Sequence, residues 1–173
     1  MDVTNRELSL TATVDWGAAV WAGFLAGVVS FLLYLFFVPA VVGAGNAWVI
    51  VRLMGSVLLG AEVLAPPATF DGAALFSALV FHFAISIAMA IVIAFVLHRW
   101  GLLTGIFGGA VFGLFFFAIN YYTLSYFFPY FFAMAHWSVV LVHVIFGALA
   151  GGIYELCEVE AFEANEDMAG VTS

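Results

Sequence analysis

Four stretches of this 173-residue chain are long and apolar enough to cross a membrane. A hydrocarbon layer of about 30 Å needs about 20 helical residues to cross it. The stretches cover residues 16–38, 72–97, 101–121 and 134–156. Because lipid offers no hydrogen bonds to a backbone, each stretch must satisfy its own polar groups by forming a helix. The sequence therefore predicts an all-α membrane protein with four transmembrane helices.

The composition favours the same class of protein. Hydrophobic residues make up 66% of the chain and charged residues only 8%, which is too apolar for a soluble core of this size to hide. The net charge is −8, and the only basic residues are Arg6, Arg52 and Arg99. A chain without a basic surface cannot displace counterions from phosphates, so a nucleic-acid partner is excluded. The lipid bilayer is the partner that this composition predicts.

A shorter apolar segment, residues 47–64, lies between the first and second stretches and contains Arg52. An arginine at the centre of a span costs roughly 2.5 to 3.5 kcal/mol on an insertion scale. We therefore expect a short interfacial or re-entrant helix here. Residues 1–157 then form a single transmembrane domain, and residues 158–173 form an acidic tail that we expect to be disordered.

Charge and aromatic residues indicate an orientation. With four spans, Arg6 and Arg99 lie on the same side, which the positive-inside tendency makes cytoplasmic. Both termini are then expected in the cytoplasm. The opposite side carries an aromatic loop at residues 126–132, which is too apolar to stand in water. We expect this loop to lie in the headgroup region or against another protein.

Glycines recur at four-residue spacing within the apolar stretches. Lines of small residues let helix backbones approach closely, which is a main source of helix association in lipid. The simplest interpretation is packing inside one chain, and self-association or a partner helix is the alternative. The residues predicted to pack helices are Gly23, Gly27, Gly101, Gly105, Gly109, Gly113, Gly147 and Gly151.

Two histidines, His82 and His143, lie inside apolar stretches, and each begins a line of small residues. Intramembrane histidines are uncommon, face the protein interior and are candidates for function. At about 1.5 Å per residue, His82 lies about 16 Å past Asp71 and His143 about 13 Å past Met134. The two imidazoles are therefore expected at similar depth on parallel helices.

Three roles are open to this histidine pair. The first is structural, with each imidazole bonding a neighbouring carbonyl or hydroxyl and fixing helix register. The second is bis-histidine ligation of a b-type haem, for which Arg52 and Arg99 are the available propionate partners. The third is a proton or substrate path of a small transporter. The candidates for a polar crevice beside His82 are Arg52, Asn120 and Tyr122.

The sequence offers no set of residues for catalysis. A copper or zinc site with two imidazoles would lack ligands, since Cys157 lies far below His143. No nucleophile with a base and an orienting acid can be assembled from the pattern. We therefore expect no catalytic residues, no metal site and, outside the haem alternative, no cofactor. The predicted function is that of a non-catalytic accessory or interaction component of a larger membrane complex, or of a homo-oligomer.

Six short motifs stand out along the chain: Leu64-Ala65-Pro66-Pro67-Ala68-Thr69-Phe70-Asp71, Phe81-His82-Phe83, Gly109-Ala110-Val111-Phe112-Gly113-Leu114, Asn120-Tyr121-Tyr122, Phe128-Pro129-Tyr130-Phe131 and His143-Val144-Ile145-Phe146-Gly147. Together they resemble a family of small, uncharacterised four-span proteins of the bacterial inner membrane. The resemblance covers residues 50–155 and implies a compact four-span fold in that membrane. A sodium:proline symporter label borne by some members is not carried over, because such transporters have about ten or more spans. The chain departs from the family pattern before Trp137, where Ala135 and His136 replace an Arg-Asn pair.

Overall fold

The computed structural model describes residues 10–43, 45–158 and 161–164. Within these residues, four helical segments are long and apolar enough to cross a membrane, and one shorter apolar helix lies between the first and second. This confirms the predicted fold class. The four segments are Trp16–Val42, Gly72–Leu97, Leu102–Phe127 and Trp137–Cys157.

The first span is longer than predicted and changes its helical form along the way. It consists of α1 (Trp16–Leu32), a π-helical turn (Leu33–Phe37) and α2 (Val38–Val42). Pro39 lies in α2, where it has no N–H and its ring would crowd the carbonyl one turn earlier. A wider turn before a proline relieves this crowding, so the chain stays helical through the proline.

The short helix α3 (Ala47–Leu59) is followed by a 3-10 turn (Ala61–Leu64). Asn46 caps α3, its side chain accepting a hydrogen bond from the Trp48 N–H at 2.9 Å. Its 13 residues reach only about 20 Å, which is less than a hydrocarbon layer requires. The helix instead packs against the start of the next span.

The remaining spans are α4 (Gly72–Leu97), α5 (Leu102–Phe127) and α6 (Trp137–Cys157). The bounds of α4 are as predicted, and the Asp71 carboxylate caps it by accepting from two backbone N–H groups. Helix α5 runs six residues past the predicted end because its apolar sequence continues until the residue before Pro129. Helix α6 starts at Trp137 rather than at the predicted residue 134, because a 3-10 turn (Pro129–Met134) precedes it.

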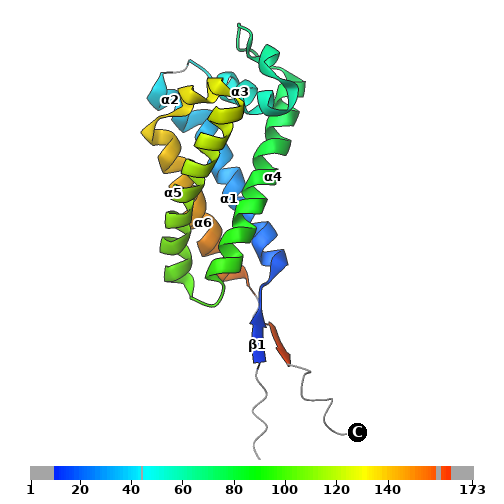
Figure 1. Cartoon of the computed structure of the whole chain (residues 1–173), viewed down its shortest axis with the longest axis vertical. Helices are drawn as coiled ribbons and strands as arrows, with labels where there is room; N and C mark the ends of the chain where they lie inside the picture. The colour runs from blue at the N-terminus through cyan, green and yellow to red at the C-terminus, as the bar shows by residue number, and fades with distance from the viewer. Residues whose placement is uncertain (1–9, 44, 159–160, 165–173) are drawn as a thin grey trace, which may run out of the picture.

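Figure 1 shows the helices as one bundle with two different ends. We call the end that carries residues 38–71 and 128–136 the proline end, because it holds all four prolines of the chain. The terminal end carries the α4–α5 turn and the pair β1 (Leu10–Thr13) and β2 (Ala161–Ala164), which are antiparallel. The two described ends of the chain therefore lie on one side of the bundle, as an even number of spans requires.

Strand β2 lies within the acidic segment that we expected to be a disordered tail. The other residues of that segment, 159–160 and 165–173, lie outside the described part of the chain. No local pattern predicts this strand, because its pairing partner is more than a hundred residues away.

A seam of glycines joins α5 to α6. A side chain on Gly109 would overlap the carbonyl of Gly147, and one on Gly151 would overlap the carbonyl of Gly105. Helix α1 meets α4 in the same way, since a Cβ on Gly23 would lie 2.7 Å from the Ile87 backbone. Close contact of this kind maximises dispersion between helices in a solvent that provides no hydrophobic drive. The predicted glycines that lie in these two contacts are Gly23, Gly27, Gly105, Gly109, Gly113, Gly147 and Gly151.

Gly101 has a different role from the one we predicted. A Cβ on Gly101 would meet nothing within 4 Å, so it packs no helix. It caps α5 with a φ of 82°, a conformation that favours glycine, and so serves the tight α4–α5 turn. Gly55, which the spacing did not reveal, does pack helices, because its Cβ would lie 2.6 Å from the Ala74 carbonyl oxygen.

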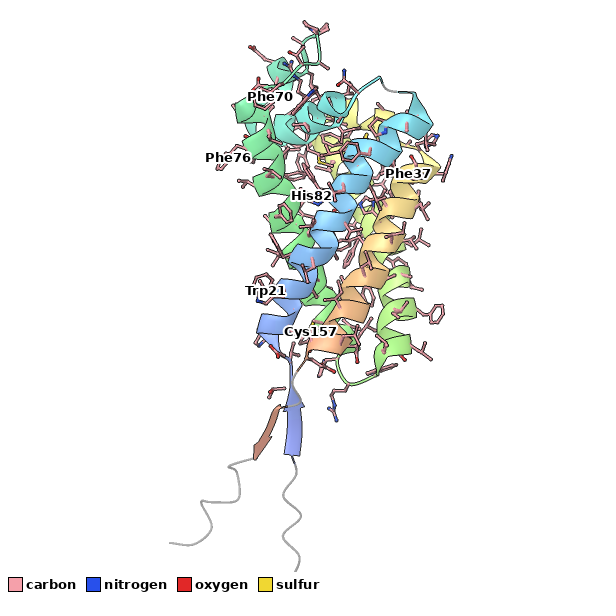
Figure 2. The ribbon with its side chains drawn as sticks, turned by 180° about the vertical axis from the view of Figure 1, so that it is seen from behind. Trp21, Phe37, Phe70, Phe76, His82 and Cys157 are labelled. Carbon is pink, nitrogen blue, oxygen red and sulfur yellow. The ribbon has the colours of Figure 1, made fainter. Side chains whose placement is uncertain are left out.

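Large apolar side chains cover the outside of the bundle. Trp21 and Phe76 are 62% and 69% exposed and point away from it in Figure 2, whereas His82 lies inside. A surface of this kind is stable in contact with lipid tails and unfavourable in water. The protein is therefore a multi-pass membrane protein.

The glycine seam can be tested with Gly109→Ala. The added methyl group overlaps the Gly147 carbonyl, and such overpacking typically costs about 1–3 kcal/mol of unfolding free energy. The measurement is thermal unfolding in mild detergent, followed by circular dichroism. The matched control is Gly72→Ala, whose new methyl would meet only the Phe70 ring at 3.9 Å. Equal stability of the two variants would contradict the role of the seam.

Candidate functional site

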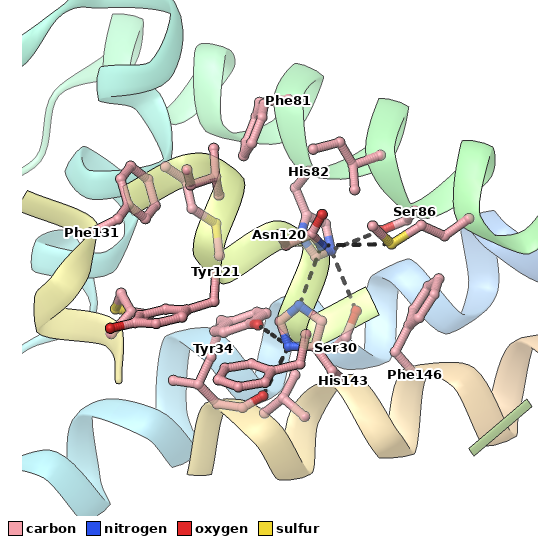
Figure 3. A pocket seen from close by; sticks show the side chains of 18 of the residues that line it. Ser30, Tyr34, Phe81, His82, Ser86, Asn120, Tyr121, Phe131, His143 and Phe146 are labelled. Carbon is pink, nitrogen blue, oxygen red and sulfur yellow. Dashed lines mark hydrogen bonds between the residues drawn. The ribbon is translucent and has the colours of Figure 1, made fainter. Parts of the chain in front are cut away.

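The two predicted histidines line one cavity in the proline-end half of the bundle. This cavity, which we call the histidine cavity, has a volume of about 100 Å³ and is bounded by residues from α1, α3, α4, α5 and α6. Figure 3 shows its polar side chains gathered at the centre, with phenylalanine rings around them. Its polar lining consists of Ser30, Tyr34, His82, Ser86, Asn120, Tyr121 and His143.

His82 on α4 is bound to the backbone of α1. Its Nε2 lies 2.9 Å from the carbonyl oxygen of Gly27, and because a carbonyl only accepts, Nε2 carries the proton and donates it. The absence of a side chain at Gly27 lets the helices approach this closely, since a Cβ there would lie 3.1 Å from the Ser86 Cβ. The hydroxyls of Ser30 and Ser86 lie farther from Nε2, at 3.4 and 3.5 Å.

His143 on α6 uses the opposite ring nitrogen as its donor. Its Nδ1 lies 2.9 Å from the Val139 carbonyl oxygen and therefore carries the proton. Its Nε2 lies 3.4 Å from Asn120 Nδ2 and accepts from that amide. The Tyr34 hydroxyl lies 3.1 Å from Nδ1. His143 is thus bound to α5 and to the first span as well as to its own helix.

Tyr34 stands between the two histidines. Its ring centroid lies 6.2 Å from that of each imidazole, edge to face in both cases, and the side chain is 7% exposed. Both imidazoles therefore contact the same tyrosine ring. Tyr34, Ser30 and Ser86 were not among the predicted site residues. Ser86 does lie in the line of small residues below His82, which was the one sequence signal that pointed to it.

Two of the three predicted crevice residues lie elsewhere. Arg52 donates to the carbonyl oxygens of Val63, Ala65 and Thr69 at 3.0 to 3.2 Å, and so ties α3 to the segment after it. Tyr122 is 70% exposed on the outside of α5. Among these three candidates only Asn120 lines the histidine cavity.

The cavity does not fit a haem. Nε2 of His82 donates to Gly27, so the only lone pair that His82 could offer to an iron is that of Nδ1. A haem macrocycle is also too large to fit inside a cavity of about 100 Å³. Arg52 is engaged with carbonyls, and Arg99 lies at the opposite end of the bundle. Within the described residues, no three His, Cys, Asp or Glu side chains are grouped to hold a metal ion.

The cavity is closed toward the terminal end. Below it, Phe116, Phe146, Ala26, Ala90 and neighbouring residues form a buried apolar cluster. A second cluster of small residues around Ala19, Ala22 and Tyr154 continues to the end of the bundle. The polar lining therefore stops at about half the depth of the helices.

Comparison with protein-family models, with curated proteins and with solved structures gives no match. The resemblance of residues 50–155 to small bacterial four-span proteins stays a prediction. The geometry of the histidine cavity is therefore the basis for assigning a function.

The two histidines are expected to show opposite tautomers. His82 should carry its proton on Nε2 and His143 on Nδ1, because each of these nitrogens faces a carbonyl oxygen. Nitrogen-15 NMR of histidine-labelled protein in nanodiscs measures this directly. His136 serves as an internal reference, since its Nδ1 accepts from the Ser138 N–H at 3.2 Å and its proton is expected on Nε2. The same tautomer at His82 and His143 would contradict the assigned hydrogen bonds.

The role of Arg52 can be tested with Arg52→Lys. Lysine lacks the planar fork that reaches several carbonyls at once. Amide hydrogen exchange at Ala65 and Thr69, which are hydrogen-bonded in this segment, should become about tenfold faster. Arg99→Lys, at the other end of the bundle, should leave these amides unchanged. Unchanged exchange in Arg52→Lys would show that the guanidinium bonds do not hold the segment.

Proposed function

We propose that this chain is a non-catalytic multi-pass membrane protein that binds a small uncharged molecule in the histidine cavity. The observation that carries the proposal is the convergence of hydrogen-bonding groups from α1, α4, α5 and α6 inside otherwise apolar walls. Small-molecule sites in proteins combine mostly apolar walls with a few placed polar groups in this way. No Asp, Glu, Lys or Arg is among the cavity's lining residues, which favours an uncharged ligand.

The arrangement of Ser86 and His82 supports binding rather than catalysis. The Ser86 hydroxyl lies 3.5 Å from His82 Nε2, and the Ser30 hydroxyl lies 3.4 Å from the same nitrogen. An activated serine needs an imidazole nitrogen free to take its proton, with an acid orienting the other nitrogen. Here Nε2 already donates to Gly27, and no carboxylate lines the cavity.

The closed lower half favours a binding site over a path. A solute or proton path needs polar groups or water along its whole length. The residues between the cavity and the terminal end form tightly packed apolar clusters. We therefore place the small transporter second to a one-sided binding protein.

We further propose that the protein serves as an accessory component of a larger membrane complex in the bacterial inner membrane. Tyr126, Phe127 and Phe132 are 80%, 67% and 60% exposed at the proline end, where they suit contact with headgroups or a partner subunit. Arg99 lies at the terminal end, which the positive-inside tendency makes cytoplasmic.

The proposal is tested by filling the cavity. Leu124→Trp places a larger side chain in the cavity wall, whereas Leu114→Trp places the same side chain on the 50% exposed outer face of α5. Each protein is purified from its own membrane in mild detergent, and its organic extract is analysed by mass spectrometry. We expect wild type and Leu114→Trp to retain the same non-phospholipid molecule, and Leu124→Trp to lose at least about nine-tenths of it.

An extract of wild type that contains only phospholipid and detergent would contradict the proposal. So would equal retention by Leu124→Trp and wild type, since the bound molecule would then lie outside the cavity. Circular dichroism of both variants shows whether the bundle is intact, so loss of the ligand is separated from loss of the fold.

A further inference from the structure

Helices α4 and α5 are neighbours that separate toward the proline end. They are joined by a turn of residues 98–101, yet α4 packs mainly on α1 and α3 whereas α5 packs mainly on α6. Figure 1 shows them together at the terminal end and apart at the other. The histidine cavity lies where the two helices have separated. Its wall on this side consists of Ile85 and Met89 of α4 and Leu124 of α5. These three side chains are only partly buried, so this wall faces the bilayer.

The cavity also has hydrogen-bonding capacity that the protein leaves unused. Nδ1 of His143 already carries a proton, so the Tyr34 hydroxyl next to it keeps its own proton for another acceptor. Ser86 is 4% exposed, and in the described residues the one hydrogen-bond contact of its hydroxyl is the 3.5 Å approach to His82 Nε2, which donates to Gly27. One N–H of Asn120 faces only the weak acceptor Met89 Sδ, at 3.6 Å. The unused groups are therefore mostly donors.

The walls set the shape of a fitting ligand. Phe81, Phe117, Tyr121, Phe131 and Phe146 all line the cavity, and flat aromatic walls suit a flat ring. A volume of about 100 Å³ is small and suits a single ring rather than a larger molecule. Only the ring of a longer molecule would fit inside the cavity, and the rest of that molecule would lie outside it. A hydrocarbon tail would be stable against the apolar wall between α4 and α5.

We propose that the histidine cavity takes the ring of a lipid-soluble quinone, which enters from the bilayer between α4 and α5. A quinone is uncharged and flat, and its carbonyl oxygens accept hydrogen bonds from donors such as Tyr34, Ser86 and Asn120. Its apolar tail remains between the two helices, in lipid. This inference rests on the proposed function and names the chemical class of the ligand.

The experiment uses decylubiquinone as the probe. It is titrated into the full-length protein in nanodiscs, and the histidine ring carbon-13 signals are followed by NMR. The chain has four histidines, and we expect saturable shifts of His82 and His143 only. His98 and His136 lie at the two ends of the bundle and are internal controls. Absence of shifts at saturating probe, or equal shifts at all four, would overturn the proposal.

Removal of the Tyr34 hydroxyl tests the hydrogen bond that we assign between Tyr34 and the quinone. Tyr34→Phe keeps the packed ring and removes the donor, so the Kd for decylubiquinone should rise about three- to tenfold. Tyr122→Phe, which removes a hydroxyl from the exposed face of α5, should leave the Kd unchanged. Equal affinity of the two variants would overturn the assignment of Tyr34 as a donor to the quinone.

Entry of the quinone from the bilayer, between α4 and α5, is tested by a separate measurement. A nitroxide attached at Leu124→Cys, in a Cys157→Ser background, is expected to collide with oxygen dissolved in lipid and little with a water-soluble nickel chelate. The opposite result would show that the cavity opens to water and would overturn entry from the bilayer.

The outcomes separate this inference from the proposed function. Failure of decylubiquinone to bind, together with loss of a retained molecule in Leu124→Trp, overturns the quinone and leaves the binding protein. Failure of both experiments overturns both.

Discussion

The close contact of α5 with α6 is the interaction on which the site depends. Without side chains at Gly109, Gly113 and Gly147, the two backbones lie near enough for the carbonyl of His143 to occupy the place of a Gly113 side chain. At this separation Asn120, which lies about two turns past Gly113 on α5, reaches the imidazole of His143 on α6. A wider spacing of the two helices would leave an amide and an imidazole without partners in an apolar medium, which is costly.

A second close glycine contact, between α1 and α4, positions the other histidine. Gly27 brings α1 against α4, and its carbonyl oxygen is the acceptor for His82. In both places a glycine contact does more than pack helices, because it exposes backbone or brings a polar side chain within reach of an imidazole. The histidines are thus fixed in orientation by neighbouring helices, and the remaining donors of Tyr34, Ser86 and Asn120 point at a common space.

Much of the fold follows from local sequence, whereas the site follows only in part. Apolar length and the Asp71 cap set the bounds of α4, while the π-helical turn before Pro39 shifted the end of the first span. His82, His143 and Asn120 were found because polar residues are rare in apolar spans. Tyr34 was missed because an aromatic side chain in such a span has no signature until its neighbours are known. Arg52 was misplaced because its partners are carbonyls, which leave no trace in a sequence.

The joint between α4 and α5 makes the bundle mechanically asymmetric. The turn at residues 98–101 and the β1–β2 pair tie the helices together at one end, while at the other end α4 and α5 are held by different neighbours. Thermal motion that parts the two helices must therefore be smallest at the terminal end and largest at the proline end. The glycine contacts join α5 to α6 and α1 to α4, so a separation of α4 from α5 at the proline end would leave these contacts in place.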